Sequence, residues 1–178
     1  MSTVIYRISR LRRRYKPGRI KVLFVAESLP ESSDAEVRFF YNPEQERGDH
    51  LYRAVMKVVF PEEFKYRRGE KDKWLRKFKG HCYYLIDATD RPVNRLSSAE
   101  RRRALDAALE PKLSEINLLV SPSTPIVLVK KNVFEAFYWR LRNAGYYVVN
   151  EAFLPFPSHG HQNEFVRECR DCLCKAKQ

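Results

Sequence analysis

A carboxylate and a hydroxyl, Glu27 and Ser28, directly follow an uninterrupted apolar run from Val22 to Ala26. Such a run is typical of a strand that is buried on both faces of a parallel sheet. Polar side chains at the carboxyl end of such a strand lie where open α/β sheets bind their ligands. The aromatic pair Phe39 and Phe40 follows within reach. A polar floor beside an aromatic wall predicts a pocket for a planar base.

Two further apolar segments end in charged residues. The segment from His81 to Ala88 carries Asp87 near its end, and the segment from Pro125 to Val129 is followed by Lys130 and Lys131. The carboxyl ends of parallel strands gather at one edge of a sheet. We therefore expect all three strand ends to contribute to one site.

The elements that must position these residues alternate along the chain. Apolar residues recur at helical spacing in the segments 48–60, 97–119, 130–145 and 162–175. A capping-box pattern begins at Ser97, and Pro111 predicts a kink or split in the same helix. Residues 146–149 form a fourth apolar segment. This order predicts an α/β fold: a three-layer α/β/α sandwich with a central, mostly parallel four-stranded sheet, in a single domain 1–178.

Residues 1–19 form a basic N-terminal extension without any acidic residue. The segment predicts an edge strand, a short helix or a tail, and Pro17 and Gly18 separate it from the first strand. The whole chain has a net charge of +12 and a sequence pI near 9.7. This excess favours an anionic partner, with nucleic acid ahead of an anionic membrane surface; a solvated basic surface is the alternative.

Several classes of protein are excluded by composition. No apolar run approaches the roughly 18 residues of a membrane span, and no apolar segment follows the basic N-terminus as in a secretory signal. Four cysteines without such a signal indicate a reducing compartment, so we expect an intracellular protein of the cytoplasm or nucleoid.

The cysteines and histidines could suggest a metal. Cys169, Cys172 and Cys174 lie in a predicted terminal helix, where the third cannot share a face with the first two. His159 and His161 have the spacing of a metal pair, but no nearby side chain completes a tetrahedral site. We expect structural cysteines, histidines that contact phosphate or a groove, and neither a metal nor another cofactor.

Four segments resemble motifs of the uracil-DNA glycosylase superfamily, in the order of that family. They are VLFVAES with the following FFY, LIDATDRPVNR, TPIVLVKKNVFEAF and LPFPSHG. The resemblance covers most of the chain. It implies a uracil-DNA glycosylase-like fold and an enzyme of base excision repair, a hydrolase that flips a damaged or deaminated base from DNA and cleaves its N-glycosidic bond with water. It also implies binding of double-stranded or single-stranded DNA. We further expect a monomer that binds no membrane.

The resemblance assigns roles to residues by position. Glu27 and Ser28 would be catalytic, and the base would be bound by Ala26, Phe39, Phe40 and Asp87. DNA would be contacted by Lys130, Lys131, Pro155, Phe156, Pro157, Ser158, His159 and His161.

The first motif departs from the family's in having alanine in place of glycine and a proline one residue late, and two further departures bear on the activity. Asp87 stands where the family reads the base with asparagine, and Phe156 stands where a histidine opens the last motif. An ionised aspartate only accepts hydrogen bonds, so we expect a base that offers an exocyclic amine or a ring N–H in place of uracil. Because this histidine is absent, the second alternative is a DNA-binding protein of the same fold that has lost catalytic activity. A hydrolase of small N-glycosides is the third alternative.

Overall fold

The centre of the protein is a parallel sheet of three strands in the order β2-β1-β3, formed by its most apolar segments. The strands are β1 (Val22–Ser28), β2 (Tyr83–Thr89) and β3 (Ile126–Leu128) in a computed structural model that describes residues 3–31, 38–45 and 47–176. In the β1–β2 register, Ala26 pairs with Asp87 and Ser28 with Thr89. The polar ends of the two strands therefore lie side by side.

The predicted fourth strand is reduced to isolated bridges. Val148 pairs with Ile126, and Leu154 pairs with Val129, both in parallel. Between them the buried side chain of Asn150 takes the place of a strand backbone. Its Oδ1 accepts a hydrogen bond from the Leu128 N–H at 2.9 Å, and its Nδ2 donates to the Leu128 carbonyl at 3.2 Å. The four-stranded sheet is thus a three-stranded one in the described residues, because a side-chain amide ends the ladder.

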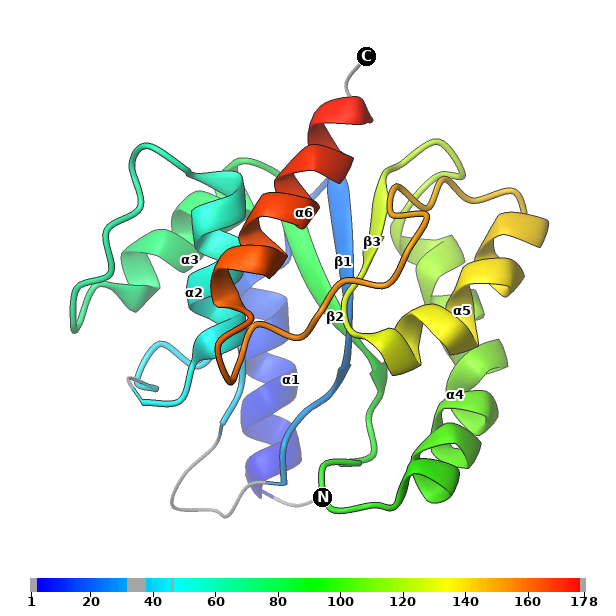
Figure 1. The fold of residues 1–178 in the computed structure, drawn as a ribbon. Coiled ribbons are helices and arrows are strands. Elements are labelled where there is room, and N and C mark those ends of the chain that lie inside the picture. The colour runs from blue at the N-terminus through cyan, green and yellow to red at the C-terminus, as the bar shows by residue number, and fades with distance from the viewer. Residues whose placement is uncertain (1–2, 32–37, 46, 177–178) are drawn as a thin grey trace.

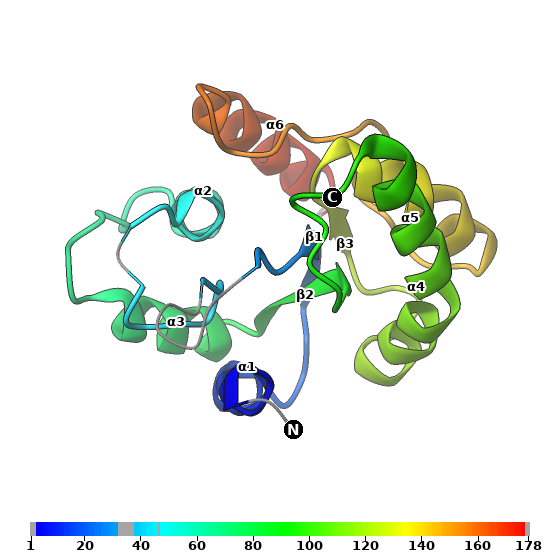
Figure 2. The same cartoon turned by 90° about the horizontal axis from the view of Figure 1, so that it is seen from below.

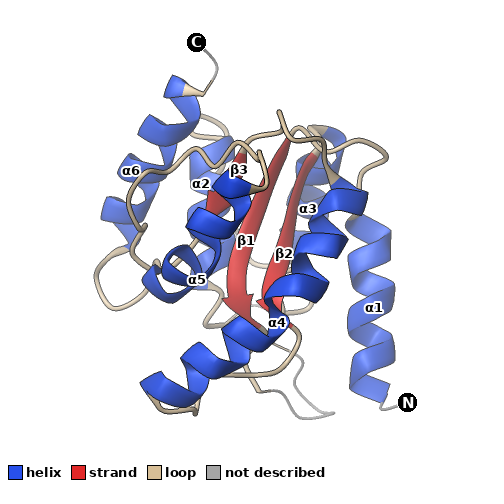
Figure 3. Cartoon of the chain, turned by 90° about the vertical axis from the view of Figure 1, so that its right-hand side faces the viewer, coloured by secondary structure: helices blue, strands red, loops and turns tan. Residues whose placement is uncertain are grey.

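Helices cover both faces of this sheet (Figures 1–3). On one side α4 and α5 pack against β2, β1 and β3, and on the other side lie α1, α2, α3 and α6 (Figure 2). The described residues contain six helices: α1 (Thr3–Tyr15), α2 (His50–Val59), α3 (Lys71–Gly80), α4 (Ser98–Leu119), α5 (Lys131–Asn143) and α6 (Gln162–Lys175). The mixed α/β architecture with a parallel sheet is confirmed.

The basic N-terminal segment is a helix that belongs to the packed body of the protein. Leu11 and Tyr15 of α1 are buried, and the Tyr15 hydroxyl donates a hydrogen bond to Asp72 of α3. Since the apolar residues of α1 repeat at helical spacing, they fasten it to the domain and leave most of its arginines outside.

Helix α4 begins as its sequence predicts and continues where a break is expected. Ser97 and Glu100 form the reciprocal capping box at its start. Pro111 lies within one continuous helix, so the predicted split does not occur. No helix of the described residues is long and apolar enough to cross a lipid bilayer.

Candidate functional site

A cleft of about 290 Å³ opens at the carboxyl end of β1 and β2, the lower end of both arrows in Figure 1. The walls combine three strand ends with the loops that follow them. The lining residues are Ala26, Glu27, Ser28, Leu29, Pro30, Arg38, Phe39, Phe40, Gln45, Gly48, Asp49, His50, Leu51, Leu85, Asp87, Asn94, Lys130 and Phe156. The structure therefore brings together eight of the residues that the sequence singles out: Ala26, Glu27, Ser28, Phe39, Phe40, Asp87, Lys130 and Phe156.

One corner of the cleft is built around Glu27, which is buried although it carries a carboxylate. Oε2 forms an ion pair with the ammonium of Lys130, and Oε1 accepts a hydrogen bond from Nδ2 of Asn132 at 3.0 Å. The Nε of Arg101 lies 3.7 Å from Oε1. A buried carboxylate needs such partners, because an isolated charge is expensive to remove from water.

The backbone of Lys130 has an unusual conformation that serves this corner. Its φ is +83° and its ψ is 141°, a backbone conformation that residues other than glycine rarely adopt. Lys130 is also the residue that precedes the first turn of α5. The turn from β3 into α5 thus holds a lysine in a strained conformation beside Glu27, and strain of this kind gathers at functional sites.

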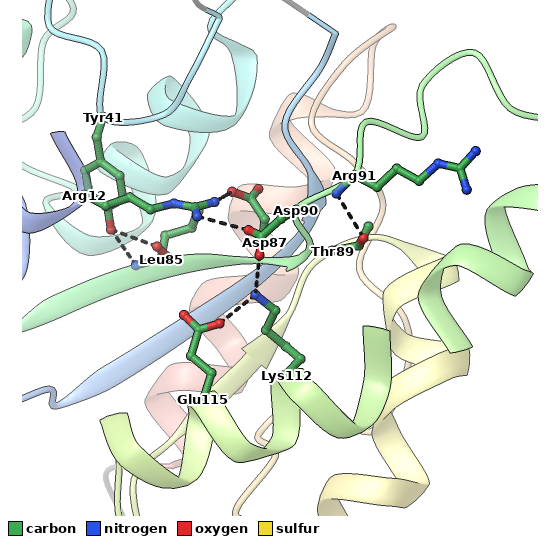
Figure 4. A network of polar contacts seen from close by, with 9 residues as sticks. All are labelled: Arg12, Tyr41, Leu85, Asp87, Thr89, Asp90, Arg91, Lys112 and Glu115. Atoms are coloured by element: carbon green, nitrogen blue, oxygen red, sulfur yellow. Dashed lines mark hydrogen bonds and ion pairs between the residues drawn. The ribbon is translucent and has the colours of Figure 1, made fainter. Parts of the chain in front are cut away.

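The second corner is built around Asp87, and its counter-ion comes from the N-terminal helix (Figure 4). The guanidinium of Arg12 donates to Oδ2 of Asp87 at 2.6 Å and to Oδ1 of Asp90 at 3.0 Å. Lys112 of α4 lies 3.7 Å from the other oxygen of Asp90 and 2.6 Å from Glu115. Arg12 is not among the residues that line the cleft, so it supports Asp87 from behind.

The pKa values in this network follow from burial and pairing. Burial raises the pKa of Asp87, and the adjacent Arg12 counteracts this shift. Burial alone would lower the pKa of Arg12, but Asp87 and Asp90 outweigh it and raise that pKa. The guanidinium therefore remains charged, which keeps a cation against Asp87 at neutral pH.

The aromatic wall consists of two buried rings with different surroundings. Phe40 packs against Tyr41, Tyr52 and Phe78 at centroid distances of 4.9–5.9 Å. The ring of Phe39 contacts Tyr41 at 5.5 Å and has the guanidinium of Arg12 at 5.4 Å from its centroid. Phe40 is thus anchored in the core, while Phe39 joins the wall to the Asp87 corner.

A buried ion pair, Lys71 with Asp49, supports the opposite side of this wall. Lys71 also donates to the Phe39 carbonyl at 3.4 Å. Burial raises the pKa of Asp49 and lowers the pKa of Lys71, while the ion pair opposes both shifts. Asp49 lines the cleft, so the pair holds a third acidic group, beside Glu27 and Asp87, at its edge.

The remaining predicted contacts lie around the rim. Phe156 faces the cleft and has the Lys130 ammonium 5.6 Å from its ring, whereas Pro157 is buried and Pro155 and Ser158 are half-buried. Lys131, His159 and His161 are exposed and do not line the cleft. Lys131 lies 3.7 Å from Glu135, and His161 lies 2.7 Å from Glu164.

The sequence interpretation missed several of the residues that hold the site. Arg12 lies in the N-terminal segment and Arg101 in the first turn of α4. The ion pair joins Asp49, which precedes α2, to Lys71 at the start of α3. The absence of acids from residues 3–21 marks Arg12 only as one arginine among several. Its single distinguishing signal is that it neighbours Leu11, a residue of the buried face.

The described residues contain no group of three or more histidine, cysteine or acidic side chains placed to hold a metal ion. Cys169 is buried in the core, and burial raises the pKa of its thiol. The thiol of Cys172 is half-buried and its pKa is also raised. Thiols in such environments are poor metal ligands and poor nucleophiles.

Models of known protein families give no match to this chain, and no curated protein matches it in sequence. The resemblance to the uracil-DNA glycosylase superfamily therefore stays a prediction. The support that the structure offers for it is the chemistry of the side chains that line the cleft.

Proposed function

We propose that this protein is a DNA base-excision glycosylase with a uracil-DNA glycosylase-like fold. The observation that carries the proposal is the convergence of Glu27, Asp87 and the wall of Phe39 and Phe40 on one cleft. The volume of the cleft, about 290 Å³, lies just below the range of roughly 300–1,000 Å³ that is usual for ligand pockets. A site of this size suits a single extruded base better than a large cofactor.

In this proposal Glu27 serves the hydrolytic step. A water oxygen forms the bond to the sugar C1′ while the bond from C1′ to the base nitrogen breaks. The bonding electrons leave with the base, which later takes up a proton, and Glu27 accepts the proton of the attacking water. The carboxylate also favours the positive charge that develops on the sugar, and Lys130 supplies a cation for the departing anionic base.

Asp87 serves the choice of base. Its Oδ2 is engaged by Arg12, while the residue itself lines the cleft. A carboxylate held in this way presents acceptors only, so it cannot donate to O4 of uracil and favours a base that places only donors, an exocyclic amine or a ring N–H, at that edge. The proposed substrate is therefore a damaged or deaminated base other than uracil.

The test is release of free base from oligonucleotides, in duplex and single-stranded form. The substrates carry uracil, hypoxanthine, xanthine or a methylated base at one position. We expect release of one of the last three to exceed release of uracil, with Glu27→Gln inactive and Asp87→Ala unselective. No release of any base would reject the activity, and a preference for uracil that survives in Asp87→Ala would reject the role of Asp87.

A DNA-binding protein without hydrolysis is the second candidate. It is favoured by the full engagement of Glu27, whose two oxygens are occupied by Lys130 and Asn132. The presence of Phe156 in the position of the family's histidine also favours this candidate. Salt-dependent DNA binding without base release would select this candidate, and absence of DNA binding would favour a hydrolase of small N-glycosides. For the first two candidates we propose a monomer inside the cell that does not bind membranes.

A further inference from the structure

The outer face of α1 carries a concentration of positive charge that the cleft does not use. No acidic residue occurs from Thr3 to Lys21. Leu11 and Tyr15 bury the inner face of the helix, while Arg10 and Arg13 are exposed on the outer face. The arrangement separates the apolar residues that fasten the helix from the cations that it presents to solvent.

Three arginines of α1 have acidic partners within the protein. Arg7 pairs with Glu44, Arg12 with Asp87 and Asp90, and Arg14 with Asp72. They hold the helix to the domain. Arg10 and Arg13 form no ion pair with any acid among residues 3–31, 38–45 and 47–176. Their charges therefore add nothing to the internal ion pairs of the described structure.

The charged surface continues from α1 onto its neighbour. Figures 2 and 3 show α1 and α3 side by side, and residues of the two helices are in contact. Lys73 and Arg76 of α3 are exposed, and Asp72 of the same helix is shared by Arg14 and Arg76. The two helices thus form one basic surface in which arginines outnumber acids.

An aromatic ring accompanies these cations. Tyr6 is 55% exposed and precedes Arg10 and Arg13 by four and seven residues, so the three side chains share one face of the helix. Arginine beside an exposed aromatic ring is typical of surfaces that bind nucleic acids, where cations meet phosphates and rings stack on bases.

We propose that the outer face of α1, defined by Tyr6, Arg10 and Arg13, binds the sugar–phosphate backbone of a nucleic acid that extends away from the cleft. The inference rests on the proposed function for its partner, and it adds a contact surface that the cleft and its rim do not contain. Helix α1 is about 20 Å long at 1.5 Å per residue. That length corresponds to roughly six nucleotides of one duplex strand at about 3.4 Å each.

A lipid surface is the competing anionic partner, and the packing of α1 argues against it. A helix that binds a bilayer inserts its apolar face, and the apolar face of α1 is buried against the domain. Only Ile5 and Tyr6 remain exposed as large apolar side chains on α1. The structure thus favours an electrostatic contact with the phosphates of a nucleic acid.

The test compares two double variants in salt titrations of DNA binding by fluorescence anisotropy. One is Arg10→Gln with Arg13→Gln, and the matched control is Arg140→Gln with Arg142→Gln, which removes two exposed arginines from α5. Each phosphate contact with duplex DNA contributes about 0.9 to the slope of log K against log salt. We expect the α1 variant to reduce the magnitude of this negative slope by about 1.8 and the control to leave it unchanged, with equal Tm values.

An unchanged slope in the α1 variant, or an equal loss in the α5 control, would overturn the inference. It would also fall if the α1 variant lost binding to vesicles of phosphatidylserine and phosphatidylcholine but kept its affinity for DNA. The base-release assay separates this result from the activity. A reduced slope in the α1 variant of a protein that releases no base supports the surface and rejects the enzyme, and base release with an unchanged slope does the reverse.

Discussion

Glu27 and Asp87 are two buried carboxylates in one cleft, but their partners come from opposite faces of the sheet. Lys130, Asn132 and Arg101, on the side of α4 and α5, hold Glu27. Arg12 of α1 holds Asp87 from the other side. Lys130 lines the cleft together with Glu27, whereas Arg12 lies outside the lining.

Because of this difference in their partners, we expect Glu27 to be available for reaction and Asp87 to be held in place. A ligand in the cleft can bind Lys130 in place of Glu27, because Lys130 also lines the cleft. Arg12 does not line the cleft, so we expect its contact with Asp87 to persist whether the cleft is filled or empty. We infer that the Glu27 corner is suited to chemistry and the Asp87 corner to recognition, and four predictions test this division.

The largest effect is expected from Glu27→Gln on base release. Removal of a general base slows a reaction by about 100-fold to 10,000-fold. Stability should fall as well, because glutamine keeps the size of the side chain but loses the charge that pairs with Lys130 and leaves only one acceptor for Lys130 and Asn132. Single-turnover release of base measures the first effect and thermal denaturation the second. Full activity in the variant would remove Glu27 from the chemistry.

Arg12→Ala should mainly affect stability. Removal of one partner from a buried ion pair costs about 3–5 kcal/mol because the other charge is left unpaired. For a chain of this size the Tm should fall by roughly 6–20 °C. The matched control is Arg10→Ala on the same helix, an exposed position where we expect a change within about 0.5 kcal/mol.

The double variant Arg12→Ala with Asp87→Asn checks the reason for that loss. If an uncompensated carboxylate destabilises Arg12→Ala, neutralising Asp87 should recover much of the Tm. Equal Tm values for the single and double variants would instead attribute the loss to the packing of Arg12 on Phe39.

A smaller effect is expected from the backbone of Lys130. Both Lys130→Gly and Lys130→Ala remove the ion pair with Glu27, but only glycine adopts a φ of +83° without strain. The glycine variant should therefore be more stable than the alanine variant by about 1 kcal/mol. Chemical denaturation measures the difference, and a more stable alanine variant would show that the conformation is not strained.

The smallest effect is expected on the loss of stability at acid pH, through Asp90 beside Asp87. Burial alone would raise the pKa of Asp90, but Lys112 and Arg12 outweigh it and lower the pKa below its ordinary value of 3.8. Asp90 therefore contributes stability above this value, and the contribution is lost as the pH falls through the lower value of the folded state. Asp90→Asn should make the Tm difference between pH 5 and pH 3 smaller than in wild type. An unchanged difference would contradict the shift.

Much of the fold can be read from local patterns. The apolar runs that end at Ala26 and Ala88 predict the two long strands, and the capping box at Ser97 predicts the start of α4. These features depend on neighbours in the sequence, so the chain specifies them locally. The predicted strand at residues 146–149 is reduced to a bridge with Ile126, because the Asn150 amide takes the next hydrogen bonds along the sheet edge, those of Leu128.

The sequence by itself determined that polar groups follow the strands and that aromatic rings stand near them, since strand order and polarity bring Glu27 and Asp87 to one edge. Only the tertiary structure decided how these charges are compensated. Arg12 lies 75 residues from Asp87 and Lys130 lies 103 residues from Glu27, so no local pattern pairs them. A buried charge is paired with whichever opposite charge the tertiary packing brings within a few ångströms. The fold therefore sets the pairing, and the local sequence does not.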